Sequence, residues 1–127
     1  MSGSGTTTIA AGGALTISGS NKYLNARVLT NAGTVTWTGN GADLGGTGTA
    51  ATINNSAGAV FDVQNNQSLY FGNGLGHTFN NAGLFKKSAG TSLTSITWAF
   101  NNTGTVEVQT GSLYLGGGGT RGCHALC

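Results

Sequence analysis

The chain has 127 residues, enough for one domain, and carries a formal net charge of +2 with charged residues at only 6%. So few charges exclude a nucleic-acid interface, because such an interface needs clustered Lys and Arg to displace counterions. Glycine occurs 24 times and proline is absent, which excludes collagen and indicates many turns.

Hydrophobic residues make up 38% of the chain and fall in short alternating runs, which argues against a disordered low-complexity segment. No run approaches the roughly 20 apolar residues of a membrane-spanning helix, so we expect no membrane insertion. The first residues carry no signal-peptide pattern and run straight into repeat-like sequence. We therefore expect a segment of a longer parent protein.

One short theme recurs along the chain, weakly at residues 9–15 and clearly at 29–35, 53–60, 79–85 and 100–106. Each clear copy has an apolar residue, an asparagine, a glycine and a second apolar residue. The apolar residues that open the copies are 20, 24, 26 and 21 residues apart: Ile9, Leu29, Ile53, Phe79 and Phe100. Such a period, with loops of variable length, is typical of β-solenoid coils.

Each copy predicts three short strands with alternating apolar and polar residues. The first type leads into the asparagine, as at 77–79 and 98–100. The second follows the Asn-x-Gly turn, at 35–37, 60–63, 84–86 and 106–108. The third follows a polar turn, at 69–71, 93–94 and 113–115.

Equivalent strands recur in the same order, so we expect them to stack in parallel, about 4.8 Å apart, with like residues on like. The predicted fold is all-β: a right-handed parallel β-helix (β-solenoid) of about five three-strand coils of 20–26 residues. It spans residues 1–119, and an atypical tail follows at 120–127. The expected inward columns are Ile9, Leu29, Ile53, Phe79 and Phe100; Leu15, Val35, Phe61, Phe85 and Val106; and Leu24, Leu44, Leu69, Leu93 and Leu113.

The repeated asparagines and glycines are predicted to be structural. Amide side chains at equivalent places can stack into a hydrogen-bonded ladder and also suit tight turns. The glycines that follow are expected at positive-φ or close-approach positions. The ladder residues are Asn31, Asn55, Asn81 and Asn102, and the glycines are Gly33, Gly58, Gly83 and Gly104.

These Asn-x-Gly-Thr-Val repeats resemble those of filamentous-haemagglutinin-like, autotransporter-like and other large bacterial surface proteins. The resemblance covers about residues 4–119 and is strongest over 100–119, which reads FNNTGTVEVQTGSLYLGGGG. It implies a parallel β-helix within a long exported chain that serves in adhesion or cell-surface scaffolding, so the parent protein is expected outside the cell or at its surface. It supplies no catalytic residues, and a fold alone does not carry function.

Three carboxylates are the only candidates for a carbohydrate-active centre: Asp43, Asp62 and Glu107. Glycoside hydrolysis needs two carboxyl groups about 5–9.5 Å apart. In the predicted register Asp62 and Glu107 face outward two coils apart, about 9.6 Å, with Lys86 between them. A charge-compensated ladder explains all three residues, so we expect a surface contact rather than an enzyme centre.

Tyr70 and Tyr114 are predicted to face outward two coils apart, with Thr94 between them. Aromatic rows on a solenoid face can stack on sugar rings, which leaves a glycan or another surface partner open. Solitary exposed aromatics are also common on protein surfaces.

The tail holds one compact cluster of soft metal ligands, Cys123, His124 and Cys127. With His77 or a partner chain these residues could hold zinc, although a structural zinc site normally takes four ligands. The alternatives are an unstructured tail, or a disulfide within or between chains. We expect no cofactor, with zinc as the alternative.

Two classes of function remain open. A structural and interaction module needs no conserved pocket and acts by surface contact or assembly. A carbohydrate-active or hydrolytic β-helix would need a groove that collects Asp62, Glu107, His77 or the tail ligands. We favour the first class, and we expect self-association through the solenoid ends, where backbone groups and core are left uncovered.

Overall fold

The computed structural model describes residues 5–19, 21–39, 44–47, 50–71 and 76–116. These residues form short strands and no helix, and accordingly no helix among them could span a membrane. The strands are β1 (Thr6–Ile9), β2 (Ala14–Ile17), β3 (Lys22–Asn25), β4 (Val28–Asn31), β5 (Thr34–Trp37), β6 (Leu44–Thr47), β7 (Thr52–Asn55), β8 (Val60–Val63), β9 (Leu69–Phe71), β10 (Thr78–Asn81), β11 (Leu84–Lys87), β12 (Leu93–Ile96), β13 (Ala99–Asn102), β14 (Thr105–Val108) and β15 (Ser112–Leu115).

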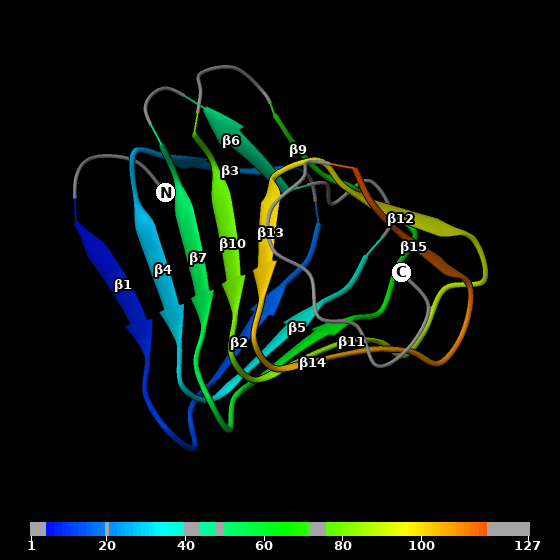
Figure 1. Cartoon of the computed structure of the whole chain (residues 1–127), viewed down its shortest axis with the longest axis horizontal. Coiled ribbons are helices and arrows are strands. Elements are labelled where there is room, and N and C mark those ends of the chain that lie inside the picture. Colours follow the sequence, from blue (N-terminus) through cyan, green and yellow to red (C-terminus); the bar gives the residue numbers. More distant parts are fainter. Residues whose placement is uncertain (1–4, 20, 40–43, 48–49, 72–75, 117–127) are drawn as a thin grey trace.

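The strands stack into three five-stranded sheets, and every pair is parallel. Sheet A has the order β1-β4-β7-β10-β13, sheet B holds β2-β5-β8-β11-β14, and sheet C holds β3-β6-β9-β12-β15. Successive strands along the chain visit the three sheets in turn, so three strands make one coil (Figure 1). This arrangement confirms the predicted all-β parallel β-solenoid with three strands in each coil.

The core of sheets A and B follows from period-two alternation, which turns every second side chain inward. In sheet A, Leu29, Ile53, Phe79 and Phe100 are direct partners in one column, and all are at most 2% exposed. In sheet B the predicted column is found in full, with partners in the order Leu15, Val35, Phe61, Phe85 and Val106.

The predicted place of Ile9 is wrong by two residues. Ile9 pairs with Asn31, and Thr7 lies opposite Leu29. Ile9 directly precedes a turn in which the Gly13 amide donates to the Ala10 carbonyl at 2.8 Å. Later coils have an asparagine at this place, and the first copy lacks that asparagine, so its opening residue was aligned with the wrong column.

The predicted column of sheet C is correct only at Leu44 and Leu69, which are direct partners. The column continues through Ile96 and Leu115, whereas Leu93 points outward and is 48% exposed. Thr94 is buried, because its hydroxyl donates to the Asn65 carbonyl at 3.0 Å. Two more pairs complete the correction: Leu24 lies opposite Gly46, and Leu113 lies opposite Thr94.

The repeated glycines meet both needs expected of them. Gly58 has a φ of +83°, in the left-handed region that favours glycine. At Gly104 a Cβ atom would lie 2.2 Å from the Gly83 carbonyl oxygen, so only glycine fits between stacked turns.

Candidate functional site

Four asparagines form a continuous buried ladder along the corner between sheets A and B. The side-chain amide of Asn31 donates to Asn55 at 2.9 Å, Asn55 donates to Asn81 at 2.8 Å, and Asn81 donates to Asn102 at 2.8 Å. The same three amides also donate to backbone carbonyls one coil further on, at 2.8–3.0 Å. Their polar groups are therefore used to hold coils together.

A second asparagine ladder runs along the outer face of sheet A. Asn80 donates to Asn54 at 2.9 Å, and Asn101 donates to Asn80 at 3.0 Å. Sequence reasoning missed this ladder, although the Asn-Asn doublet in three copies carries the signal. In a strand, adjacent residues face opposite sides, so each doublet contributes one amide to each ladder.

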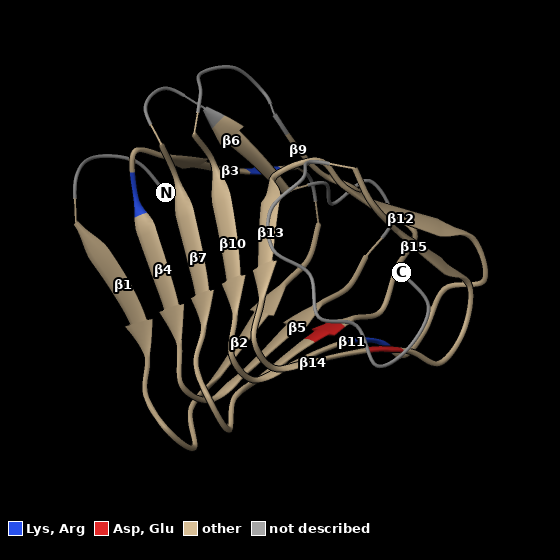
Figure 2. Cartoon of the chain, viewed as in Figure 1, with Lys and Arg blue, Asp and Glu red and all other residues tan. Residues whose placement is uncertain are grey.

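Asp62, Lys86 and Glu107 are direct partners in one outward row of sheet B, in the predicted register. The carboxylates are held by neutral groups. Asp62 accepts hydrogen bonds from Gln64 at 2.8 Å and from the Ser88 hydroxyl at 2.6 Å, and Gln109 donates to Glu107 at 2.7 Å. Figure 2 shows red and blue segments close together in sheet B, in a ribbon that is otherwise almost uncharged. The third candidate carboxylate, Asp43, lies outside the described residues.

The expected row of Tyr70 and Tyr114 does not form. Tyr70 lies opposite Gly45, and Tyr114 lies opposite Ser95, because sheet C has another register than predicted. Tyr70 instead meets Tyr23 across Gly45, with their hydroxyls 3.0 Å apart and ring centroids 6.4 Å apart. Sequence reasoning missed this pair, which forms because Gly45 lies between Tyr23 and Tyr70 in sheet C. Tyr114 is 59% exposed.

His77 is a buried side chain with a structural environment. Its Nδ1 atom accepts a hydrogen bond from the Ala51 amide at 3.0 Å, and its ring centroid lies 5.3 Å from that of Trp98. Gly46 leaves room for the ring, since a Cβ there would come within 2.6 Å of it. Among the described residues no group of three or more His, Cys, Asp and Glu could hold a metal. The predicted ligands Cys123, His124 and Cys127 lie outside the described residues.

Lys87 is the one fully buried lysine among the described residues. Its ammonium contacts the Asn65 carbonyl and lies 3.2 Å from the Ala89 carbonyl and 3.3 Å from the Asn66 side-chain oxygen. Burial lowers the pKa of Lys87 below its ordinary value of 10.5. Alternation along β11 carried the signal for this position, because Phe85 faces inward two residues earlier.

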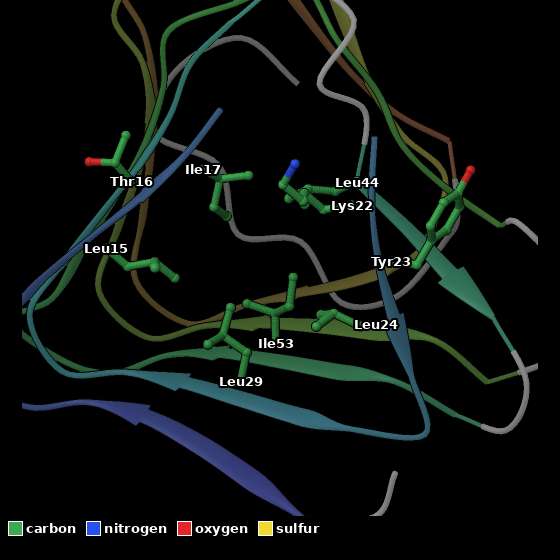
Figure 3. Close-up of a pocket in the computed structure, with 9 residues that line it drawn as sticks. All are labelled: Leu15, Thr16, Ile17, Lys22, Tyr23, Leu24, Leu29, Leu44 and Ile53. Carbon is green, nitrogen blue, oxygen red and sulfur yellow. The ribbon is translucent and has the colours of Figure 1, made fainter. Parts of the chain in front are cut away.

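An apolar cavity of about 230 Å³ lies inside the first coils. Figure 3 shows six aliphatic side chains converging on it: Leu15, Ile17, Leu24, Leu29, Leu44 and Ile53. Lys22 and Tyr23 stand at its margin in the same view. Sequence reasoning did not identify this cavity, because it predicted a column of large side chains running through every coil.

Comparison of the chain with protein-family models, with curated proteins and with solved structures found no match. The features of the described residues that bear on function are two asparagine ladders, a row of charges with neutral partners, a tyrosine pair, the buried side chains of His77 and Lys87, and an apolar cavity.

Proposed function

We propose that this chain is a structural and interaction module, a stiff segment of a bacterial cell-surface or adhesin-like repeat protein. The observation that carries the proposal is the ladder of Asn31, Asn55, Asn81 and Asn102, in which each amide bonds the next coil. A column of identical residues, each held by its neighbours, serves the stacking of coils along one axis.

The polar residues of the outer faces support the same proposal. Asn54, Asn80 and Asn101 bond one another, and the Asp62 carboxylate is occupied by neutral side chains of its own and the next coil. Such contacts stiffen a rod, since bending the axis would break several of them at once. Location outside the cell or at its surface is part of the proposal and follows from the resemblance of the repeats.

A spacer function can be tested by placing the chain between two folded reporter domains. The separation of the reporters should be narrowly distributed, and duplicating the coil of residues 78–98 should lengthen it by about 4.8 Å. Spin labels on the reporters allow this distance to be measured by double electron–electron resonance. A flexible Gly-Ser linker of equal length serves as the control and should give a broad distribution. An equally broad distribution for the solenoid would contradict the proposal.

Contact between copies through the solenoid ends belongs to the same proposal. Among the described strands, β1, β2 and β3 pair along one edge only, as do β13, β14 and β15. Unpaired backbone edges are templates for further strands. Light scattering at several protein concentrations should show association that survives reductant. A monomer at every concentration would contradict this contact, and dissociation on reduction would assign it to Cys123 or Cys127 instead.

A further inference from the structure

The outer face of sheet A is a regular array of short, uncharged side chains. Each strand of this sheet pairs with the next over four residues, one to one and without a shift (Figure 1). Alternation turns two residues of every strand outward, so the face consists of two columns that run along the solenoid axis. The first column holds Thr6, Val28, Thr52, Thr78 and Ala99, and the second holds Thr8, Thr30, Asn54, Asn80 and Asn101.

The backbone fixes the spacing of this array, and the side chains hold its groups in place. Neighbours within a column lie about 4.8 Å apart, the strand spacing, and the two columns lie about 6.6 Å apart, twice the rise per residue. Threonine and valine are β-branched and therefore have few χ1 rotamers. The outer asparagine ladder fixes the amides of Asn54, Asn80 and Asn101, and side-chain ladders of this kind hold a sheet flat. The face is therefore a rigid grid of hydroxyl, amide and methyl groups.

The outer faces of the other two sheets differ from this grid. Sheet B carries the charged row of Asp62, Lys86 and Glu107, and sheet C carries the Tyr23–Tyr70 pair. The two outward columns of sheet A contain neither a charged nor an aromatic residue. Such a face offers no ion pair to a charged ligand and no ring on which a sugar could stack. It also lacks the aromatic and arginine side chains that usually anchor a protein partner. Its chemistry suits a neutral partner that repeats with the spacing of the grid.

We propose that the outer face of sheet A binds the surface of ice. An ice crystal presents a neutral lattice of water molecules whose repeats are close to the two spacings of this face. Hydroxyl groups both donate to and accept from such water, and the threonine and valine methyl groups lie against it without competing for its hydrogen bonds. Thr8 is exposed and Thr30 and Thr52 are half-buried, as expected for short side chains that stand side by side. Because these groups are already ordered, binding costs little conformational entropy. Ice binding uses this face alone, so it does not depend on a spacer function or on contact between the solenoid ends.

The test is the partition of the whole chain between slowly growing ice and the remaining liquid. The wild type should be enriched in the ice, and it should also slow recrystallisation of a polycrystalline ice film. Thr30→Tyr places a ring above the grid, so the face no longer meets a flat lattice and both effects should be lost. The matched control is Thr36→Tyr, the same substitution in the same coil at a half-buried outward position of sheet B, which should behave as the wild type.

Circular dichroism shows whether the variants keep their β-structure. Thr8→Tyr, at the exposed place beside Thr30 in the same column, serves if Thr30→Tyr does not fold. Exclusion of the wild type from the ice, or an equal loss of enrichment in a folded Thr30→Tyr and in Thr36→Tyr, would overturn the proposal. Retention on crystalline cellulose that Thr30→Tyr abolishes would also overturn it, because the lattice recognised by this face would then be a polysaccharide.

Discussion

The first coil, β1–β3, and the coils from β7 onward share one backbone arrangement but differ in how their interior is filled. Between the third and fifth coils, Phe61, Phe79, Phe85 and Phe100 form a cluster whose neighbouring ring centroids lie 5.1–5.6 Å apart. In the first coil the corresponding interior is aliphatic and partly empty. Strand register in this solenoid is therefore maintained without close packing.

The first coil also departs from the later ones in three columns. Ile9 stands in the asparagine column and Thr7 in the column of Leu29. Lys22 stands in the sheet C column that continues with Leu44, Leu69, Ile96 and Leu115. Arg27 replaces part of the lost contact by donating to the Thr7 hydroxyl at 3.0 and 3.1 Å. The regular coils thus contain the asparagine-ladder and aromatic contacts that the first coil lacks.

The largest expected effect tests this difference between the coils. Phe79→Ala should lower the free energy of unfolding by about 3–5 kcal/mol, because it removes a ring at the centre of the aromatic cluster. Leu15→Ala should cost only about 1–2 kcal/mol, because its half-buried side chain borders an existing cavity. Urea denaturation followed by circular dichroism measures both. Equal losses would show that the first coil is packed as tightly as the others.

Sheets A and B could be predicted from the sequence largely because an asparagine, followed two or three residues later by a glycine, marks their strands in every clear copy. Sheet C has no such marker. Its strands follow loops of different length and composition, and the apolar residue nearest to the expected place was assigned inward. At Leu93 that choice failed, because alternation from Ile96 places Thr94 inside, where the Asn65 carbonyl satisfies its hydroxyl.

The candidate sites were less predictable than the fold, because most of them do not repeat from coil to coil. The Asn31 to Asn102 column could be found because its members repeat. The Tyr23–Tyr70 pair depends on Gly45, a residue in a strand that has no apolar alternation. The cavity depends on what is missing from the first coil, and a pattern of side-chain sizes indicates such a space only after the register is known.

Substitutions in the asparagine ladders should cause an intermediate loss in the free energy of unfolding. Asn81→Ala should cost about 1–3 kcal/mol, because it removes the buried hydrogen bonds of Asn81 with Asn55 and Asn102. Asn80→Ala, in the adjacent outer ladder, should cost less than about 1 kcal/mol, because water can replace its half-exposed amide. Chemical denaturation of the two variants gives the comparison. If both losses are negligible, the inner ladder contributes nothing to holding the coils together.

The smallest expected change in the free energy of unfolding concerns Lys87. This buried lysine is a polar irregularity within the regular coils. Lys87→Met keeps the length of the side chain and removes its charge. At high pH, where the amine is neutral, its free energy of unfolding should lie within about 1 kcal/mol of the wild-type value, because the substitution then removes only hydrogen bonds of a neutral group.

The pH dependence of this difference follows from the direction of the pKa shift. Burial lowers the pKa of Lys87 below 10.5 in the folded chain, so the unfolded chain binds more protons between the two values. Wild-type stability should rise with pH across that window and fall as the pH drops through the folded pKa. Lys87→Met lacks this step, so its stability relative to the wild type increases as the pH is lowered.

Lys86→Met, one residue away on the outer face, controls for the loss of a positive charge. A constant difference between Lys87→Met and the wild type at every pH would mean that the buried ammonium is as well accommodated by its three oxygen partners as it is by water.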